Sequence, residues 1–192
     1  MANHSSAARP TARRDPRGRA SQRGNSWPIL LGCVALGALF VWLTGLQMPR
    51  LMASHFALGG VADGFMLRDR YLRFFLCITI ILPLVVALPI TVALRNPNTA
   101  INLPNRDYWL APERRAETFA FIRSQMIRFG IALLVFLCYV HWLVVRANAH
   151  SPPVLHNSSF ISAIVVLVVF MTIWTIIYIR RFGGARGKIA PR

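Results

Sequence analysis

Histidine is the residue type whose placement in this 192-residue chain first suggests chemistry, because imidazole readily ligates zinc and copper. The candidate ligands are His55, His141, His150 and His156. No two of them have HxxH spacing, and the HExxH pair of a metalloprotease is absent. Hydrogen-bonded or interfacial imidazoles are therefore the favoured interpretation. A metal site is the alternative, and no cofactor is predicted.

A serine, a histidine and an aspartate also occur close together, at Ser54, His55 and Asp63. Neighbouring side chains seldom reach the geometry of a catalytic triad, and the sequence contains no glycine-rich phosphate-binding loop. We therefore predict a non-enzymatic protein. A His55–Asp63 hydrogen bond that stabilises its own loop is the favoured role for this pair, and a direct contact to a ligand or partner is the alternative.

Long apolar segments must position these residues. The segments are residues 29–48, 74–94, 127–145 and 160–179. Each has about the 20 residues that a helix needs to cross about 30 Å of hydrocarbon, where an open backbone finds no hydrogen-bond partner. The chain combines 55% hydrophobic residues with a net charge of +16, which fits a protein whose apolar residues lie in lipid. We predict an all-α integral membrane protein with four transmembrane helices.

The 22 basic residues are distributed unevenly between the segments that flank these spans. The tail 1–27 holds six, the segment from Arg95 to Arg128 holds six, and the C-terminal end from Arg180 holds five. The loops 49–73 and 146–159 together hold the other five. The positive-inside rule therefore places both termini in the cytoplasm and these two loops outside.

The same charges indicate what the chain contacts. Because the basic residues flank apolar spans, anionic lipid headgroups are the expected partner, and nucleic acid is not. The tail 1–27 lacks apolar periodicity, so we expect a disordered basic cytoplasmic tail there, and 183–192 is expected to be a second basic tail.

Proline and small residues inside the spans predict features of helix packing. Pro83 and Pro89 remove backbone donors from the second span, so a kink is expected, either as ordinary packing or as a hinge for transport. Small residues in the first span suggest a face for close helix contact, within the chain or in a homodimer. They are Gly32, Ala35, Ala38 and Gly45.

The two longest loops carry local structural signals. In the outer loop 49–73, the glycines and an Asp-Gly step predict a compact, structured turn region. In the inner amphipathic loop 95–126, Pro112 suits the first position of a helix that continues into the third span. Arg114 and Glu117 are three residues apart on this helix, a spacing that predicts an ion pair.

Two loop motifs resemble those of a known family. The outer motif comprises His55, Phe56, Gly59, Asp63 and Gly64, and the inner motif comprises Asn102, Pro104, Asn105, Tyr108, Trp109, Pro112, Glu113 and Arg114. Over residues 30–146 the chain resembles the small bacterial membrane proteins of domain-of-unknown-function family 1648. A similar domain occurs in the membrane immunity protein for the sporulation-delay killing peptide. The resemblance implies the bacterial cytoplasmic membrane and a role in immunity or signalling.

The absence of catalytic motifs and the structured outer loop together favour one function. We predict a multi-pass membrane protein that acts by binding another membrane protein or a peptide. The sequence leaves two alternatives open. One is an oligomeric transporter of ions or small molecules that uses the proline-containing span, and the other is a metal-binding membrane protein that uses the outer histidines.

Overall fold

The computed structural model describes residues 26–94, 96 and 101–183. The predictions for the tails 1–27 and 183–192 fall almost wholly outside these residues. Long helices dominate the described part, and they are α2 (Trp27–Gly45), α3 (Arg68–Ala93), α5 (Pro112–Ala147) and α6 (Asn157–Gly183). Each of these four is long and apolar enough to cross a membrane, which confirms the prediction of four candidate transmembrane helices.

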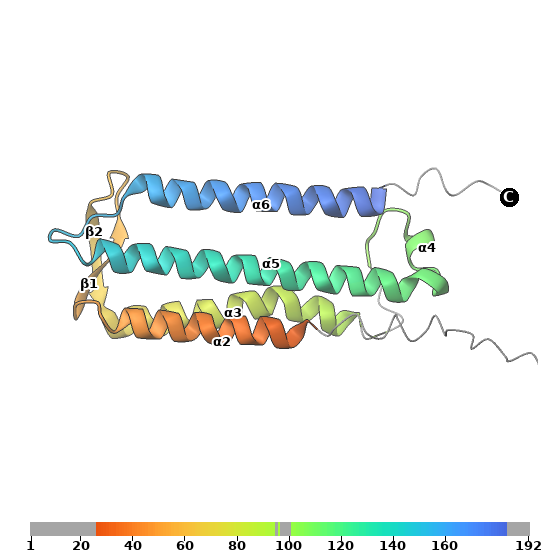
Figure 1. Ribbon diagram of the computed structural model, residues 1–192, viewed down its shortest axis with the longest axis horizontal. Coiled ribbons are helices and arrows are strands. Elements are labelled where there is room, and N and C mark those ends of the chain that lie inside the picture. The colour runs from red at the N-terminus through yellow and green to blue at the C-terminus, as the bar shows by residue number, and fades with distance from the viewer. Residues whose placement is uncertain (1–25, 95, 97–100, 184–192) are drawn as a thin grey trace, which may run out of the picture.

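Helices α2, α3 and α5 pack against one another, while α6 packs chiefly against α5 (Figure 1). One end of the bundle carries a β-hairpin and is called the hairpin end. The opposite end carries the short helix α4 (Arg106–Trp109) and is called the α4 end. The start of α2 faces the α4 end without reaching it, and α6 ends close to that end, so the described chain enters and leaves the bundle on the same side.

Glycines allow the backbones of the three packed helices to approach closely. A Cβ atom at Gly37 of α2 would lie 2.9 Å from Leu134 Cδ1 of α5. A Cβ atom at Gly130 of α5 would lie 3.0 Å from the carbonyl oxygen of Pro83 in α3. Gly32, in contrast, has open space where a Cβ atom would be, so the packed face of α2 runs through Gly37 and not through Gly32.

The segment that follows α2 is an antiparallel hairpin of β1 (Leu51–Phe56) and β2 (Ala62–Leu67). The expectation of an all-α chain is therefore wrong at the predicted loop 49–73, which contains two strands. The alternation of apolar and polar residues that would reveal these two strands is hard to recognise in the sequence, because register shifts interrupt the pairing of β1 with β2.

The hairpin leads directly into α3, which begins six residues before the predicted span 74–94. The first turns of α3 are rich in charge, so they carry no apolar signal. The helix then continues without interruption through Pro83 and Pro89 to Ala93. Pro83 is buried between helices, where its carbonyl group packs against Gly130.

At the α4 end, helix α5 begins at Pro112 and runs for 36 residues into the third span, as the position of the proline predicts. A small apolar cluster joins this region to the end of α6 and includes Leu103, Ile122 and Phe182. The indole nitrogen of Trp109 donates a hydrogen bond to the Phe182 carbonyl at 3.3 Å. This bond satisfies one of the carbonyl groups that the last turn of a helix leaves unpaired.

Candidate functional site at the hairpin end

The hairpin is attached to α5 through the side chain of Asn148. The Ala53 backbone N–H donates to Asn148 Oδ1 at 2.7 Å, and Asn148 Nδ2 donates to the Ala53 carbonyl at 2.9 Å. The amide therefore pairs with β1 as a neighbouring strand would, and Ala53 itself is fully buried. Asn148 Nδ2 also donates to the Val144 carbonyl at 2.9 Å, which orients the amide on its own helix.

A second attachment joins the end of the hairpin to α2. Arg68, the first residue of α3, donates from Nη1 to the carbonyl groups of Leu46 and Met48 at 3.1 and 3.2 Å. These carbonyls lie just beyond the C-terminus of α2, where the helix dipole favours a cation. The guanidinium group thus holds the entry and the exit of the hairpin together.

The tip of the hairpin contacts the loop that joins α5 to α6. The Leu155 N–H donates to the Gly60 carbonyl at 2.8 Å, and Asn157 Nδ2 donates to the Leu58 carbonyl. Gly60 has a φ of +80°, and a Cβ atom there would overlap the Leu155 carbonyl. Only glycine fits this position without strain. The hairpin is therefore held at its base, along β1 and at its tip.

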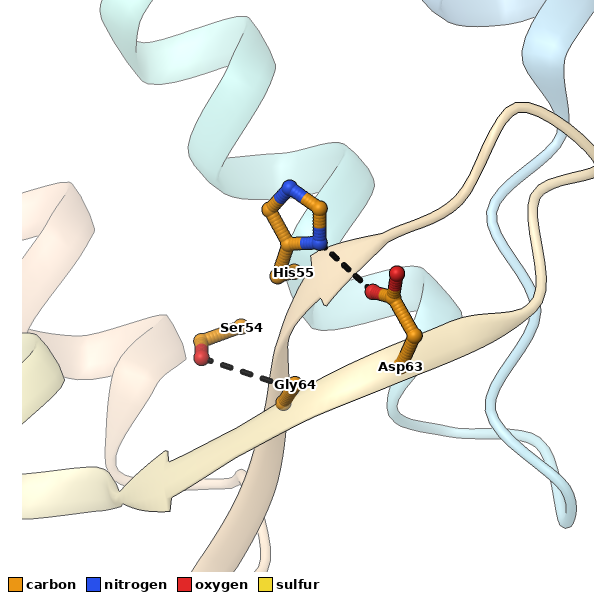
Figure 2. A network of polar contacts seen from close by, with 4 residues as sticks. All are labelled: Ser54, His55, Asp63 and Gly64. Atoms are coloured by element: carbon orange, nitrogen blue, oxygen red, sulfur yellow. Dashed lines mark hydrogen bonds and ion pairs between the residues drawn. The ribbon is translucent and has the colours of Figure 1, made fainter.

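Figure 2 shows His55 of β1 turned toward Asp63 of β2, and the Asp63 carboxylate accepts a hydrogen bond from His55 Nδ1 at 2.5 Å. This contact confirms the predicted pair. The His55 side chain is largely exposed, and the Asp63 side chain is about half exposed. The Ser54 hydroxyl instead donates to the Gly64 carbonyl at 3.5 Å. Because successive strand residues point to opposite faces, Ser54 and His55 do not form a catalytic triad with Asp63.

One face of the hairpin exposes large apolar side chains beside this polar pair. Phe65 and Leu67 alternate with Met66 along β2, and Leu51 pairs with Leu67 across the strands. Leu51, Phe65 and Leu67 are 61%, 55% and 51% exposed. At the tip, Leu58 is 99% exposed. We call Leu51, Leu58, Phe65 and Leu67 the hairpin surface. Leu51, Phe65 and Leu67 are neighbours on the two strands, and Leu58 extends the exposed apolar groups to the tip. Exposed apolar groups on a rigid element are typical of a contact surface.

His141 lies in a different place from the other predicted histidines. It is fully buried on α5, with Nε2 3.0 Å from Thr44 Oγ1 of α2 and Nδ1 3.1 Å from the Tyr71 hydroxyl of α3. Thr44 Oγ1 donates its own hydrogen to the Phe40 carbonyl at 2.7 Å. His141 therefore donates from Nε2 to Thr44 and accepts at Nδ1 from Tyr71, as a neutral imidazole. Its role is to join three helices through satisfied hydrogen bonds.

The four predicted histidines consequently do not share one site. His150 and His156 line a small pocket of about 200 Å³ between the end of α5 and the following loop, and His55 is absent from its lining. Within residues 26–94, 96 and 101–183, no group of three or more His, Cys, Asp or Glu side chains is arranged to hold a metal ion. The described residues therefore provide no set of ligands for the metal site that the sequence left as an alternative.

The inner motif forms contacts that differ from the predicted ones. Glu117 pairs with Arg181 of α6 at 2.5 Å, and not with Arg114 three residues before it. The Arg114 guanidinium lies over the Tyr108 ring, 4.1 Å from its centre. The prediction of an Arg114–Glu117 pair is therefore wrong, because α6 brings a second arginine to the carboxylate. Asn105 takes a left-handed conformation and donates from Nδ2 to the Phe182 carbonyl at 3.3 Å.

The two predicted motifs thus occupy opposite ends of one bundle. The outer motif forms the hairpin, and the inner motif forms α4 and the start of α5. Comparison of the chain with models of known protein families, with curated proteins and with solved structures finds no match.

Proposed function

We propose that this chain is a multi-pass protein of the bacterial cytoplasmic membrane that acts by binding another membrane protein or a peptide at its hairpin end. The distribution of basic residues supports placing the α4 end in the cytoplasm, since 17 of the 22 basic residues belong to segments at or beyond that end. The hairpin surface then faces the outside of the cell.

The observation that carries this proposal is the exposed apolar surface of a firmly attached hairpin. Full burial of an exposed Leu or Phe side chain contributes about 1.5–3 kcal/mol, and covering the half-exposed Leu51, Phe65 or Leu67 would contribute about half of that. Because Asn148 and Arg68 already hold the hairpin in place, little conformational entropy is lost when a partner binds. The exposed His55–Asp63 pair supplies polar groups at the edge of this surface.

The resemblance of the two loop motifs to family 1648 adds support of a different kind. A similar domain occurs in the immunity protein that protects cells from the sporulation-delay killing peptide. This likeness supports a peptide as the class of partner that the hairpin surface binds. An immunity or signalling role for this chain follows from that resemblance as part of the proposal.

Site-specific photo-crosslinking tests the proposal. A photoreactive phenylalanine analogue at Phe65 in living cells is expected to form a discrete protein adduct. The same analogue at Val165, which is 54% exposed on α6, serves as the control for a lipid-facing position. Substituting both Leu51 and Leu67 with Ser should abolish the Phe65 adduct while the melting temperature in detergent is unchanged. Adducts with lipid alone, or an adduct that survives this double substitution, would contradict the proposal.

A further inference from the structure

The seam between α5 and α6 has two hollows with different chemistry. Near the α4 end, a cavity of about 560 Å³ lies between α5, Arg181 of α6 and Ser26 ahead of α2. Its lining includes the apolar Ala120 and Phe121 and several charged and polar side chains, among them Arg123, Ser124 and Arg128. Farther along the same two helices, a groove of about 520 Å³ is almost entirely apolar, and its walls include Ala132, Val135 and Phe136 of α5 and Ala163, Val166 and Phe170 of α6.

The charge in the cavity is unbalanced. Among the described residues that line the cavity, Glu117 is the one carboxylate, and it is already paired with Arg181. Arg123 and Arg128 have no carboxylate within ion-pair distance among the residues that the structure describes. Two guanidinium groups therefore remain available to an anion, and guanidinium is well matched to the oxygens of a phosphate.

The polar cavity and the apolar groove are aligned along the bundle. Arg128, Ala132 and Val135 have i, i+4 and i+7 spacing, so they follow one face of α5. Tyr139, at the far end of the groove, is 11 residues beyond Arg128, which corresponds to about 16 Å along a helix. This length is close to half of the hydrocarbon thickness of about 30 Å, which is the depth that one leaflet's acyl chains fill.

We propose that the α5–α6 seam binds one phospholipid with an anionic headgroup, with its phosphate at Arg123 and Arg128 and an acyl chain in the apolar groove. The site rests on the proposed membrane placement of the helices, but it does not depend on the partner at the hairpin. It also accounts for the hollow that remains between α6 and α5, the helix against which α6 chiefly packs. A lipid in the seam completes the packing that protein side chains leave open.

Native mass spectrometry of the full-length protein from mixed vesicles tests the site. Vesicles would contain phosphatidylglycerol and phosphatidylcholine with the same acyl chains in equal amounts. The wild-type protein is expected to retain one phosphatidylglycerol, with at least a fivefold preference over phosphatidylcholine. Soluble glycerol phosphate at millimolar concentration should not displace it, because the acyl chain contributes to binding. Displacement by glycerol phosphate would show a simple anion site and would overturn the lipid assignment.

Substitutions distinguish the seam from general attraction to charged lipids. Replacing Arg123 and Arg128 with Gln should remove the preference, and R128K should keep most of it, because lysine retains the charge. Ala132→Phe, which fills the groove, should lower retention of both lipids. The matched control R146Q removes an exposed charge at the hairpin end and should leave binding unchanged. Equal loss in R146Q, or equal retention of both lipids by the wild type, would contradict the proposal.

The test of the lipid site can be separated from the test of the function proposed for the hairpin. The protein in which Arg123 and Arg128 are both replaced with Gln should still form the Phe65 photo-adduct, since both arginines lie away from the hairpin end of α5. Loss of lipid selectivity with an intact adduct would support two independent sites. Wild-type protein that shows no selectivity but forms the adduct would overturn the lipid site alone.

Discussion

Asn148 pairs with the backbone of Ala53, which lies 95 residues earlier in the chain, through hydrogen bonds in both directions. One side-chain amide thereby takes the place of a neighbouring strand for β1. An edge strand with unpaired backbone groups is prone to pair with other chains. The contact leaves the hairpin attached to the end of α5, with its apolar face free.

Replacing Asn148 with Ala should detach β1 from α5. The buried N–H and carbonyl groups of Ala53 would lose their partners, and each such loss costs about 1–3 kcal/mol. We expect a lower melting temperature in detergent and faster hydrogen exchange across residues 51–67. Asn102→Ala, at an exposed asparagine of the α4 end, is the matched control. Equal stability of the two variants would show that the Asn148 amide does not hold the hairpin.

The adjacent glycines of the hairpin tip provide a second test. Gly60→Ala should destabilise the protein by about 1 kcal/mol or more, because an L side chain at positive φ is strained and the Leu155 carbonyl occupies the space. Gly59→Ala should be nearly neutral, since a Cβ atom there meets open space. The comparison uses thermal unfolding of both variants. A Gly59 effect as large as the Gly60 effect would contradict the described contact between the tip and Leu155.

The buried histidine should contribute to stability and not to metal binding. His141→Ala removes a fully buried ring and leaves the Tyr71 hydroxyl unpaired, so a loss of about 2–4 kcal/mol is expected from the cavity and the lost hydrogen bond. A double-mutant cycle with Tyr71→Phe should show a coupling free energy between the two sites. Tyr139→Phe, on the same helix as His141, is the control partner. Additive effects of the His141 and Tyr71 substitutions would argue against their hydrogen bond.

The ion pair between Glu117 and Arg181 at the α4 end should contribute less to stability than the buried His141 does. Glu117 and Arg181 are partly exposed, with side chains 56% and 35% accessible, and such pairs contribute about 0–1 kcal/mol. E117Q is therefore expected to shift the melting temperature only slightly, and the shift should shrink further in high salt. A large, salt-independent loss of stability would indicate that the pair is effectively buried in lipid.

Much of the bundle is predictable because its signals are local. Each apolar span is one continuous segment of about 20 residues, so the number of membrane helices can be counted from the sequence. Pro112 marks the start of α5 because proline favours the first position of a helix. The His55–Asp63 pair is also predictable because a short turn separates the two residues.

Other features depend on contacts that are distant in sequence. The strands are stabilised by Asn148 and by the loop at Leu155, about 90 residues beyond the hairpin, while Asp63 and Gly64 themselves have low strand propensity. The burial of His141 likewise requires hydroxyl groups from two other helices. Local patterns of residues carry no information about such partners.

The placement of the hairpin outside the cytoplasm is the claim on which the account depends most. It can be measured by labelling single cysteines with a membrane-impermeant maleimide, after Cys33, Cys77 and Cys138 are replaced with Ala. We predict that L58C, at the exposed hairpin tip, is labelled in intact cells, and that N102C at the α4 end is labelled only after the cells are opened. Labelling of N102C in intact cells, with L58C protected, would contradict the proposed orientation and the site of partner binding with it.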